Sequence, residues 1–294
     1  MTSRDKPQEH PAPKPFQGHP LMQGLARGEP LTAFGIRLAR TPDIARLAKA
    51  SGHHAVWIDL EHSTIPLDAA GAICAAAHDL GLMALVRVPE REYGAIGRLL
   101  DAGASGLIFP RIETAAQAAD LAAACRFPPH GHRSAIAVLP QFGYRRLPVA
   151  ETYRLANDAV VVNVLIESPL GIENAEAIAR VPGVDLVSIG CNDLSAELGV
   201  PGDYSHPLMQ QALNTALAAC ARAGTPLSIG GIADAALNAE LLARGAAPFL
   251  MTGIDTDVLL TAMQERVRGA LAGHASVDRS PSSSSSFAPA TARP

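Results

Sequence analysis

Two acidic residues follow two apolar stretches at matching positions. Glu167 ends the stretch 160–167, and Asp193 comes shortly after the stretch 185–190. An ionised carboxylate at the end of a buried strand needs hydrogen bonds or a counter-ion, because its desolvation is costly. Carboxylate pairs suit hard divalent cations such as Mg²⁺ or Mn²⁺. The pattern therefore predicts a metal site at Glu167 and Asp193, with Co²⁺ as a further candidate ion.

Other ionisable residues also stand where apolar stretches end. Asp59, Glu61 and His62 follow one such stretch, and Arg87 ends the next. A neutral imidazole near pH 7 can accept a proton, so His62 is the candidate acid/base, with Asp59 orienting it. Arg87 is a candidate cation for stabilising negative charge that develops in a reaction.

The stretches themselves predict the fold. Eight apolar segments alternate with helix-like, Ala- and Leu-rich segments; they are 32–38, 54–60, 82–88, 106–110, 160–167, 185–190, 226–231 and 248–254. Strict alternation favours parallel strands, and eight units match a (β/α)8 barrel, an α/β fold of typically ~250 residues. A doubly wound open sheet is the alternative.

A barrel of this kind carries its active site at the C-terminal ends of the strands. The ionisable residues at or after predicted strand ends are Arg37, Asp59, Glu61, His62, Arg87, Arg111, Glu167, Asp193 and Asp255. We expect them to surround one mouth. For Arg111 and Asp255 a structural ion pair is an equal alternative.

Composition divides the chain into a domain and two tails. Residues 1–22 are rich in Pro, His and Gln, and residues 271–294 contain a Ser-rich run, so both are expected to be disordered. The barrel domain would span 23–270. The connection 126–158 lacks a clear period and is longer than usual, which is typical of functional or interface loops. Its His130 and His132 are expected to be exposed rather than to bind metal.

Charge and hydropathy exclude several classes of function. The 294 residues are 48% hydrophobic and have a net charge of −4. The chain lacks the stripe of basic residues that nucleic-acid binding needs, so nucleic acid is not an expected partner. The absence of a long apolar run or a secretory signal predicts a cytoplasmic protein without a membrane partner. The four cysteines lack metal-like spacing and are expected to be reduced and buried. Cys191 is expected to fill space rather than act as a nucleophile.

Several motifs follow one another over about residues 25–265. In chain order they are Ile58-Asp59-Leu60-Glu61-His62, Val86-Arg87-Val88-Pro89, Leu100-Asp101-Ala102-Gly103, Pro129-x-Gly131-x-Arg133, Ile166-Glu167 and Ile189-Gly190-x-x-Asp193-Leu194-Ser195. Together they resemble the HpcH/HpaI aldolase family. The resemblance implies a (β/α)8 barrel that uses a divalent metal to cleave 4-hydroxy-2-oxo acids into pyruvate and an aldehyde. It also implies a homo-oligomer, usually a hexamer built from dimers that exchange their C-terminal helices.

The resemblance assigns substrate binding to one turn. In the family this turn holds the pyruvate carboxylate beside the metal, which here implies substrate binding by Asn192, Asp193 and Ser195, together with Arg87. The segment 192–199 predicts a short helix with an Asx cap at Asn192 and a terminal glycine at Gly199. The free N–H groups at such a helix start bind anions.

The chemistry of cleavage separates two routes. Breaking the bond leaves negative charge that must be delocalised into the C2 carbonyl, through either a Lewis acid or a lysine iminium. The chain contains only Lys6, Lys14 and Lys49, none of them at a predicted strand end. The sequence therefore favours the metal route.

Departures from the family pattern concern the substrate more than the reaction. Leu165 stands where the family commonly has Gln, Ser134 where it has Gly, and Cys191-Asn192 where it has Pro-Ala. The aldehyde half of the substrate is left open. Decarboxylation of an oxaloacetate-like acid, a CoA-ester lyase related to the citrate lyase beta subunit, and a non-catalytic barrel are the alternatives.

Overall fold

The computed structural model describes residues 18–89 and 93–277. Its eight strands form one parallel sheet in the order β7-β6-β5-β4-β3-β2-β1-β8. The strands are β1 (Leu31–Ile36), β2 (Ala55–Asp59), β3 (Met83–Arg87), β4 (Gly106–Phe109), β5 (Val161–Ile166), β6 (Leu186–Gly190), β7 (Leu227–Gly230) and β8 (Phe249–Ile254). Just before β8, the Ala247 N–H donates to the carbonyl of Leu227 in β7 (2.7 Å). The sheet is thus a nearly closed barrel.

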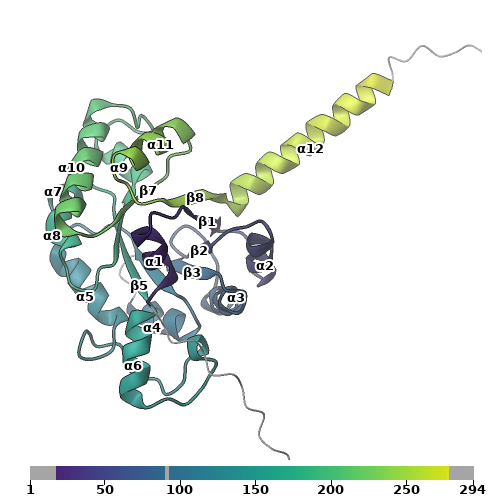
Figure 1. Ribbon diagram of the computed structural model, residues 1–294. Helices are drawn as coiled ribbons and strands as arrows, with labels where there is room; N and C mark the ends of the chain where they lie inside the picture. The colour runs from purple at the N-terminus through teal and green to yellow at the C-terminus, as the bar shows by residue number, and fades with distance from the viewer. Residues whose placement is uncertain (1–17, 90–92, 278–294) are drawn as a thin grey trace, which may run out of the picture.

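Helices follow the strands in alternation (Figure 1). They are α1 (Pro20–Ala26), α2 (Asp43–Ala50), α3 (Leu67–Asp79), α4 (Tyr93–Asp101), α5 (Ala115–Cys125), α6 (Val149–Asp158), α7 (Pro169–Glu173), α8 (Ala175–Ala179), α9 (Cys191–Glu197), α10 (Pro207–Ala223), α11 (Ala235–Ala243) and α12 (Asp255–Val277). All eight predicted strands are confirmed, with ends shifted by at most two residues. The (β/α)8 prediction is confirmed, and the open sheet is excluded.

The barrel interior is apolar toward the starts of the strands. Inward-facing side chains from seven strands form one buried cluster: Leu31, Ala33, Ala55, Met83, Leu85, Ile108, Val161, Leu165, Leu186 and Phe249. Leu21 of α1 is fully buried in the same cluster, and Met22 and Leu25 pack against it. Helix α1 therefore closes the end where the strands begin. The opposite end is left for polar side chains.

The domain boundaries differ from the expected ones at both ends. Helix α1 begins at Pro20, so the predicted tail 1–22 extends too far, because burial of Leu21 anchors this segment. Helix α12 continues to Val277, past the predicted boundary at 270. The rest of the two predicted tails lies outside the described residues.

The long connection 126–158 is built around buried contacts. It contains a 3-10 turn (Pro140–Phe142) and α6, which the sequence did not predict. Arg133 pairs with Asp101 (2.7 Å), and its guanidinium lies 4.6 Å from the Phe127 ring centroid. A side chain at Gly131 would come within 2.1 Å of the Ala123 carbonyl oxygen. The Pro129–Arg133 motif thus holds the connection against the barrel, while His130 and His132 are exposed as expected.

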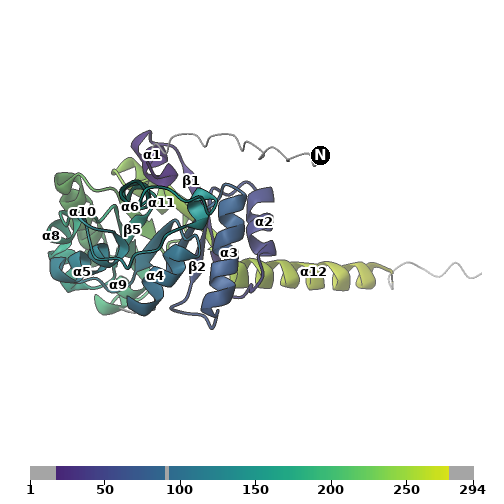
Figure 2. The same cartoon turned by 90° about the horizontal axis from the view of Figure 1, so that it is seen from below.

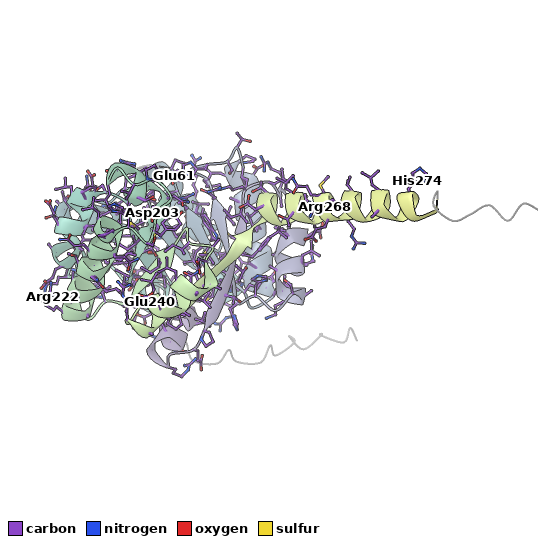
Figure 3. The ribbon with its side chains drawn as sticks, turned by 90° about the horizontal axis from the view of Figure 1, so that it is seen from above. Glu61, Asp203, Arg222, Glu240, Arg268 and His274 are labelled. Atoms are coloured by element: carbon purple, nitrogen blue, oxygen red, sulfur yellow. The ribbon has the colours of Figure 1, made fainter. Side chains whose placement is uncertain are left out.

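Helix α12 leaves the barrel directly after β8 and projects away from it (Figures 1 and 2). Arg268 and His274 mark its outer part (Figure 3). Its exposed large apolar side chains are Val258, Leu259, Leu260, Met263, Val267 and Leu271. No helix in the described part of the chain is both long and apolar enough to cross a membrane.

Candidate active site

The predicted ionisable residues meet at the C-terminal ends of the strands. Asp59 and Arg87 are the last residues of β2 and β3, and the parallel register places them side by side. Glu167 directly follows β5, and Asp193 lies in the first turn of α9, after β6. Arg37, Arg111 and Asp255 follow β1, β4 and β8. The mouth predicted from the sequence is thus formed.

Asp59 is the centre of an ion-pair network on one side of the mouth. Its carboxylate is fully buried and accepts Arg87 Nε (2.9 Å) and Nη2 (2.7 Å) in a bidentate pair. Arg37 Nε donates to the same carboxylate (2.6 Å). Burial alone would raise the pKa of Asp59, but the hydrogen bonds and charges of Arg87 and Arg37 hold it below its usual value. The carboxylate is therefore ionised and fixed.

Arg87 is held on three sides. Besides Asp59, its Nη1 lies 3.0 Å from Glu61 Oε2, and its guanidinium lies 5.0 Å from the centre of the Trp57 ring. Although Glu61 Oε2 is buried, its contact with Arg87 lacks hydrogen-bond geometry, and no other described residue donates to this atom. Burial opposes the charge of Arg87, but its contacts with Asp59 and Glu61 raise its pKa above the ordinary value. The mouth thus contains a permanent cation in one fixed orientation.

His62 lies at the open side of this network. Its side chain is 53% exposed, and Nε2 stands 3.7 Å from Glu61 Oε2. The Asp59 carboxylate accepts the main-chain N–H groups of Glu61 (3.1 Å) and His62 (3.3 Å), not the imidazole. Asp59 thus holds His62 through the main chain of the turn, and Glu61 is the acid beside the ring. Sequence reasoning gave Glu61 no role, although it stands between two residues that received one.

Glu167 has a different environment. It is 4% exposed, and its Oε2 accepts the main-chain N–H of Arg111 (3.0 Å). Burial raises its pKa to about 7, and the negative charges of Asp193 and Glu61 add to this rise, while Arg111 N–H and Arg87 oppose it. Among the described residues no arginine, lysine or histidine forms an ion pair with it. This side of the mouth has an excess of negative charge.

Two backbone features place the Glu167 carboxylate. A side chain at Gly190 would lie 2.5 Å from Glu167 Oε1, so only glycine leaves room for it. Arg111 adopts φ +53°, a left-handed conformation that is uncommon for residues other than glycine. The Arg111 side chain forms an ion pair with Glu197 of α9 (2.7 Å). This is the structural ion pair that the sequence analysis gave as an alternative for Arg111.

Helix α9 differs in part from its prediction. It begins at Cys191 with Gly190 as N-cap and has no side-chain cap, so the Asx cap at Asn192 is wrong: Asn192 lies inside the first turn. The Asn192 side chain accepts the hydroxyl of Tyr204 instead. Gly199, with φ +76°, follows the helix as expected of a terminating glycine.

Ser195 and Cys191 both point into the protein. The Ser195 hydroxyl donates to the Asn192 carbonyl (2.8 Å) and accepts the Gly202 N–H (3.1 Å). Because Ser195 is fully buried, it presents no atom to a substrate, and its expected direct contact is corrected to a structural role. Cys191 is also buried, and burial raises the pKa of its thiol to about 12, as expected of a space-filling residue.

The acidic side fits a hard divalent cation. Glu167 is buried with a raised pKa, whereas Asp193 is exposed beside it. Within residues 18–89 and 93–277 no group of three or more His, Cys, Asp or Glu is arranged to hold a metal. The protein would thus supply two carboxylates, and oxygen-preferring ions of the Mg²⁺ type commonly keep water or substrate in the other positions.

Comparison with known proteins now identifies the family. The family model for HpcH/HpaI aldolase/citrate lyase matches residues 37–262. The chain belongs to the HpcH/HpaI aldolase/citrate lyase family. The matched range contains every site residue described above, from Arg37 to Asp255. The family expected from the motifs is confirmed.

Several relatives of this chain are aldolases. The 4-hydroxy-4-methyl-2-oxoglutarate aldolase tasA of Hapsidospora irregularis is 41% identical over 72% of this chain and 79% of its own length. The 2-keto-3-deoxy-L-rhamnonate aldolase of Klebsiella pneumoniae is 32% identical over 85% of this chain and 92% of its own. A crystal structure of an HpcH/HpaI aldolase from Desulfitobacterium hafniense has a TM-score of 0.79 at 27% identity, covering 92% of this chain and 99% of its own. The aldolase class expected from the sequence is confirmed.

Proposed function

We propose that this protein is a divalent metal-dependent aldolase that cleaves 4-hydroxy-2-oxo acids into pyruvate and an aldehyde. The observation that carries the proposal is the contrast at the mouth between Glu167, whose pKa is raised to about 7 beside Asp193, and the fixed cation Arg87. A site for an enolate needs both features: a place for a cation and a second positive group facing the developing charge.

The metal would be held by Glu167 and Asp193. When bound, Mg²⁺ or Mn²⁺, or in their place Co²⁺, supplies a Lewis acid for the oxo group of the substrate. A site made of two carboxylates also explains the cost of burying Glu167, since a cation offsets the repulsion between these acids. Asp193 and Asn192, both exposed in the first turn of α9, are the proposed contacts for the pyruvate half.

The remaining steps belong to side chains of this chain. Arg87 stabilises the oxygen that becomes negative, and its pairing with Asp59 fixes the guanidinium before the substrate arrives. His62, exposed at the mouth, accepts the proton of the C4 hydroxyl, and the Glu61 carboxylate lies 3.7 Å from its Nε2. Lysine chemistry has little support: in the described residues the single lysine is Lys49, in the last turn of α2.

Pyruvate release tests the function directly. The protein is stripped with a chelator and mixed with 4-hydroxy-4-methyl-2-oxoglutarate or 2-keto-3-deoxy-L-rhamnonate, and pyruvate is followed by a lactate dehydrogenase assay. We expect pyruvate only after Mg²⁺ or Mn²⁺ is added back, and no adduct after borohydride treatment with pyruvate. A covalent pyruvyl adduct, or a preference for oxaloacetate or citramalyl-CoA, would contradict the proposal.

We also propose that the protein is a homo-oligomer, the hexamer expected of the family being the specific case. Helix α12 exposes a series of large apolar side chains, and it projects from β8 instead of folding back over the barrel (Figure 1). Exposed apolar area of this kind is typical of protein interfaces.

We further propose that the enzyme acts in the cytoplasm. Its four cysteines are free and buried, as is usual in a reducing compartment.

Light scattering on the eluting protein tests the assembly. The double variant Leu259→Glu/Val267→Glu adds charge to the exposed apolar side of α12 and is expected to reduce the particle mass. Gln264→Glu, on the same helix, is the matched control and should leave the mass unchanged. A monomeric wild-type protein would contradict the proposal.

A further inference from the structure

Asp255 occupies an unusual position, buried between the last strand and the projecting helix. It is the first residue of α12 and is 7% exposed. Its carboxylate accepts three successive main-chain N–H groups of the loop after β1: Arg37 (2.9 Å), Leu38 (2.9 Å) and Ala39 (2.8 Å). It also accepts the N–H of Thr256 (2.9 Å). All these bonds involve a charged acceptor, which makes them stronger than bonds between neutral groups.

The loop that Asp255 holds carries Arg37 toward the site. Arg37 Nε donates to Asp59 Oδ2 (2.6 Å), and the same oxygen accepts Arg87 Nη2 (2.7 Å). Asp255 is thus connected to the Arg87 guanidinium by a short series of contacts. Asp255 holds the main chain of Arg37, the Arg37 side chain binds Asp59, and Asp59 binds Arg87. Because a misplacement of about 1 Å can cost about 10²-fold in rate, such a series of contacts affects catalysis without touching substrate.

We propose that Asp255 is a positioning residue that fixes Arg37 and, through Asp59, sets the orientation of the Arg87 guanidinium. The inference rests on the proposed function, in which Arg87 faces the developing negative charge. It also means that the side chain at the start of α12 links the direction of this helix to the geometry of the mouth. A helix-capping role would direct the carboxylate at N–H groups two or three residues further along α12, whereas three of its four N–H partners come from the β1 loop.

A double-mutant cycle tests the proposal on the full-length enzyme. The variants are Asp255→Asn, Arg37→Gln and the combination of both, and the matched control is Asp257→Asn, which changes an exposed acid in the same helical turn. We expect Asp255→Asn and Arg37→Gln each to lower kcat about 10-fold to 100-fold, with KM and Mn²⁺ affinity changed less than threefold. The double variant should be no slower than the slower single variant, since both act on one series of contacts. Asp257→Asn should match the wild type.

Several results would overturn the inference. One is an Asp255→Asn enzyme as fast as the wild type, and another is an effect of Asp255→Asn that persists in full when Arg37 is already Gln. A loss of activity that follows the loss of folded protein by circular dichroism would make Asp255 a structural anchor only. If Asp255→Asn does not fold, Asp255→Glu, which keeps the charge and displaces the carboxylate, carries the same expectations. A wild-type enzyme that releases no pyruvate with metal would contradict the proposed function, whereas an active wild type with an unaffected Asp255 variant contradicts this inference alone.

Discussion

On one side of the mouth, the buried carboxylate of Asp59 receives hydrogen bonds from two arginines. On the other side, the buried carboxylate of Glu167 receives one main-chain N–H and faces two further acids. The pKa of Asp59 is lowered, whereas that of Glu167 is raised to about 7. Both are carboxylates at the C-terminal ends of strands in the same barrel, so the difference in pKa comes from their partners.

The contrast between Asp59 and Glu167 distinguishes a buried charge that stabilises the structure from one that is typical of a functional site. An ion pair such as Asp59–Arg87 offsets its own desolvation and fixes the geometry of both groups. A buried carboxylate without a counter-ion is costly, and such groups with shifted pKa values gather at functional sites. The arginine side is complete in the protein alone, whereas under the proposed function a cation completes the acidic side.

The largest expected effect comes from removing the charge on the acidic side. Glu167→Gln and Asp193→Asn should each abolish detectable Mn²⁺ binding by calorimetry, because each removes half of the protein ligands. A Lewis acid is worth several kcal/mol, so turnover should fall roughly 10³-fold or more. Glu173→Gln, at an exposed acid in α7, is the control. Undiminished affinity in both variants would refute the metal assignment.

Loss of the arginine side should act on both rate and stability. Arg87→Ala is expected to lower kcat about 10²- to 10³-fold by analogy with the loss of an oxyanion donor. The pairing of Arg87 with the fully buried Asp59 also ties this residue to stability. Breaking a buried ion pair costs about 3 kcal/mol of unfolding free energy, measured in denaturant.

Two further measurements sharpen the arginine prediction. Arg87→Lys should restore only part of the rate, since an ammonium lacks the planar fork of the guanidinium. Mn²⁺ affinity should be nearly unchanged in both variants. An effect confined to KM would make Arg87 a ground-state binding residue.

A smaller effect is expected from crowding the acidic side without changing its charge. In Gly190→Ala the new methyl group would lie 2.5 Å from Glu167 Oε1, so the carboxylate must move. Displaced ligands typically reduce metal affinity about 10- to 100-fold. Gly230→Ala, at the matching end of β7, is the control because its nearest contact is an ordinary 3.6 Å. Equal Mn²⁺ affinity in the two variants would show that Glu167 does not bind the metal.

The smallest expected effect is a pH dependence that only the acidic side should show. The folded pKa of Glu167, about 7, lies above its unfolded value of 4.5, so the metal-free folded state binds the additional proton between these values. Stability of the metal-free protein should therefore fall as pH rises from about 5 to about 7. Mn²⁺ competes with that proton, so its affinity should rise up to about tenfold per pH unit below pH 7. Glu167→Gln should flatten the stability profile; an unchanged slope would assign the proton to another group.

The strands and the position of the mouth were predictable from the sequence. Parallel strands that are buried on both faces have continuous apolar runs in their sequence, and all eight predicted runs are strands in the structure. The barrel topology then brings their C-terminal ends together, which is why Glu167, Arg87 and His62 could be expected at one mouth. The inward burial of Ser195 was not predictable, because a serine in a helix reads the same whether its hydroxyl faces substrate or the Gly202 N–H.

The sequence by itself determined which residues reach the mouth, since periodicity and strand order are local properties of the chain. Only the tertiary structure decided how they pair. The register between β2 and β3 puts Asp59 opposite Arg87, and the loop after β1 adds Arg37 to the same carboxylate. Glu61, not Asp59, thereby becomes the neighbour of the His62 ring. These choices depend on side-chain directions and distances between segments far apart in the chain, for which a single sequence holds no local signal.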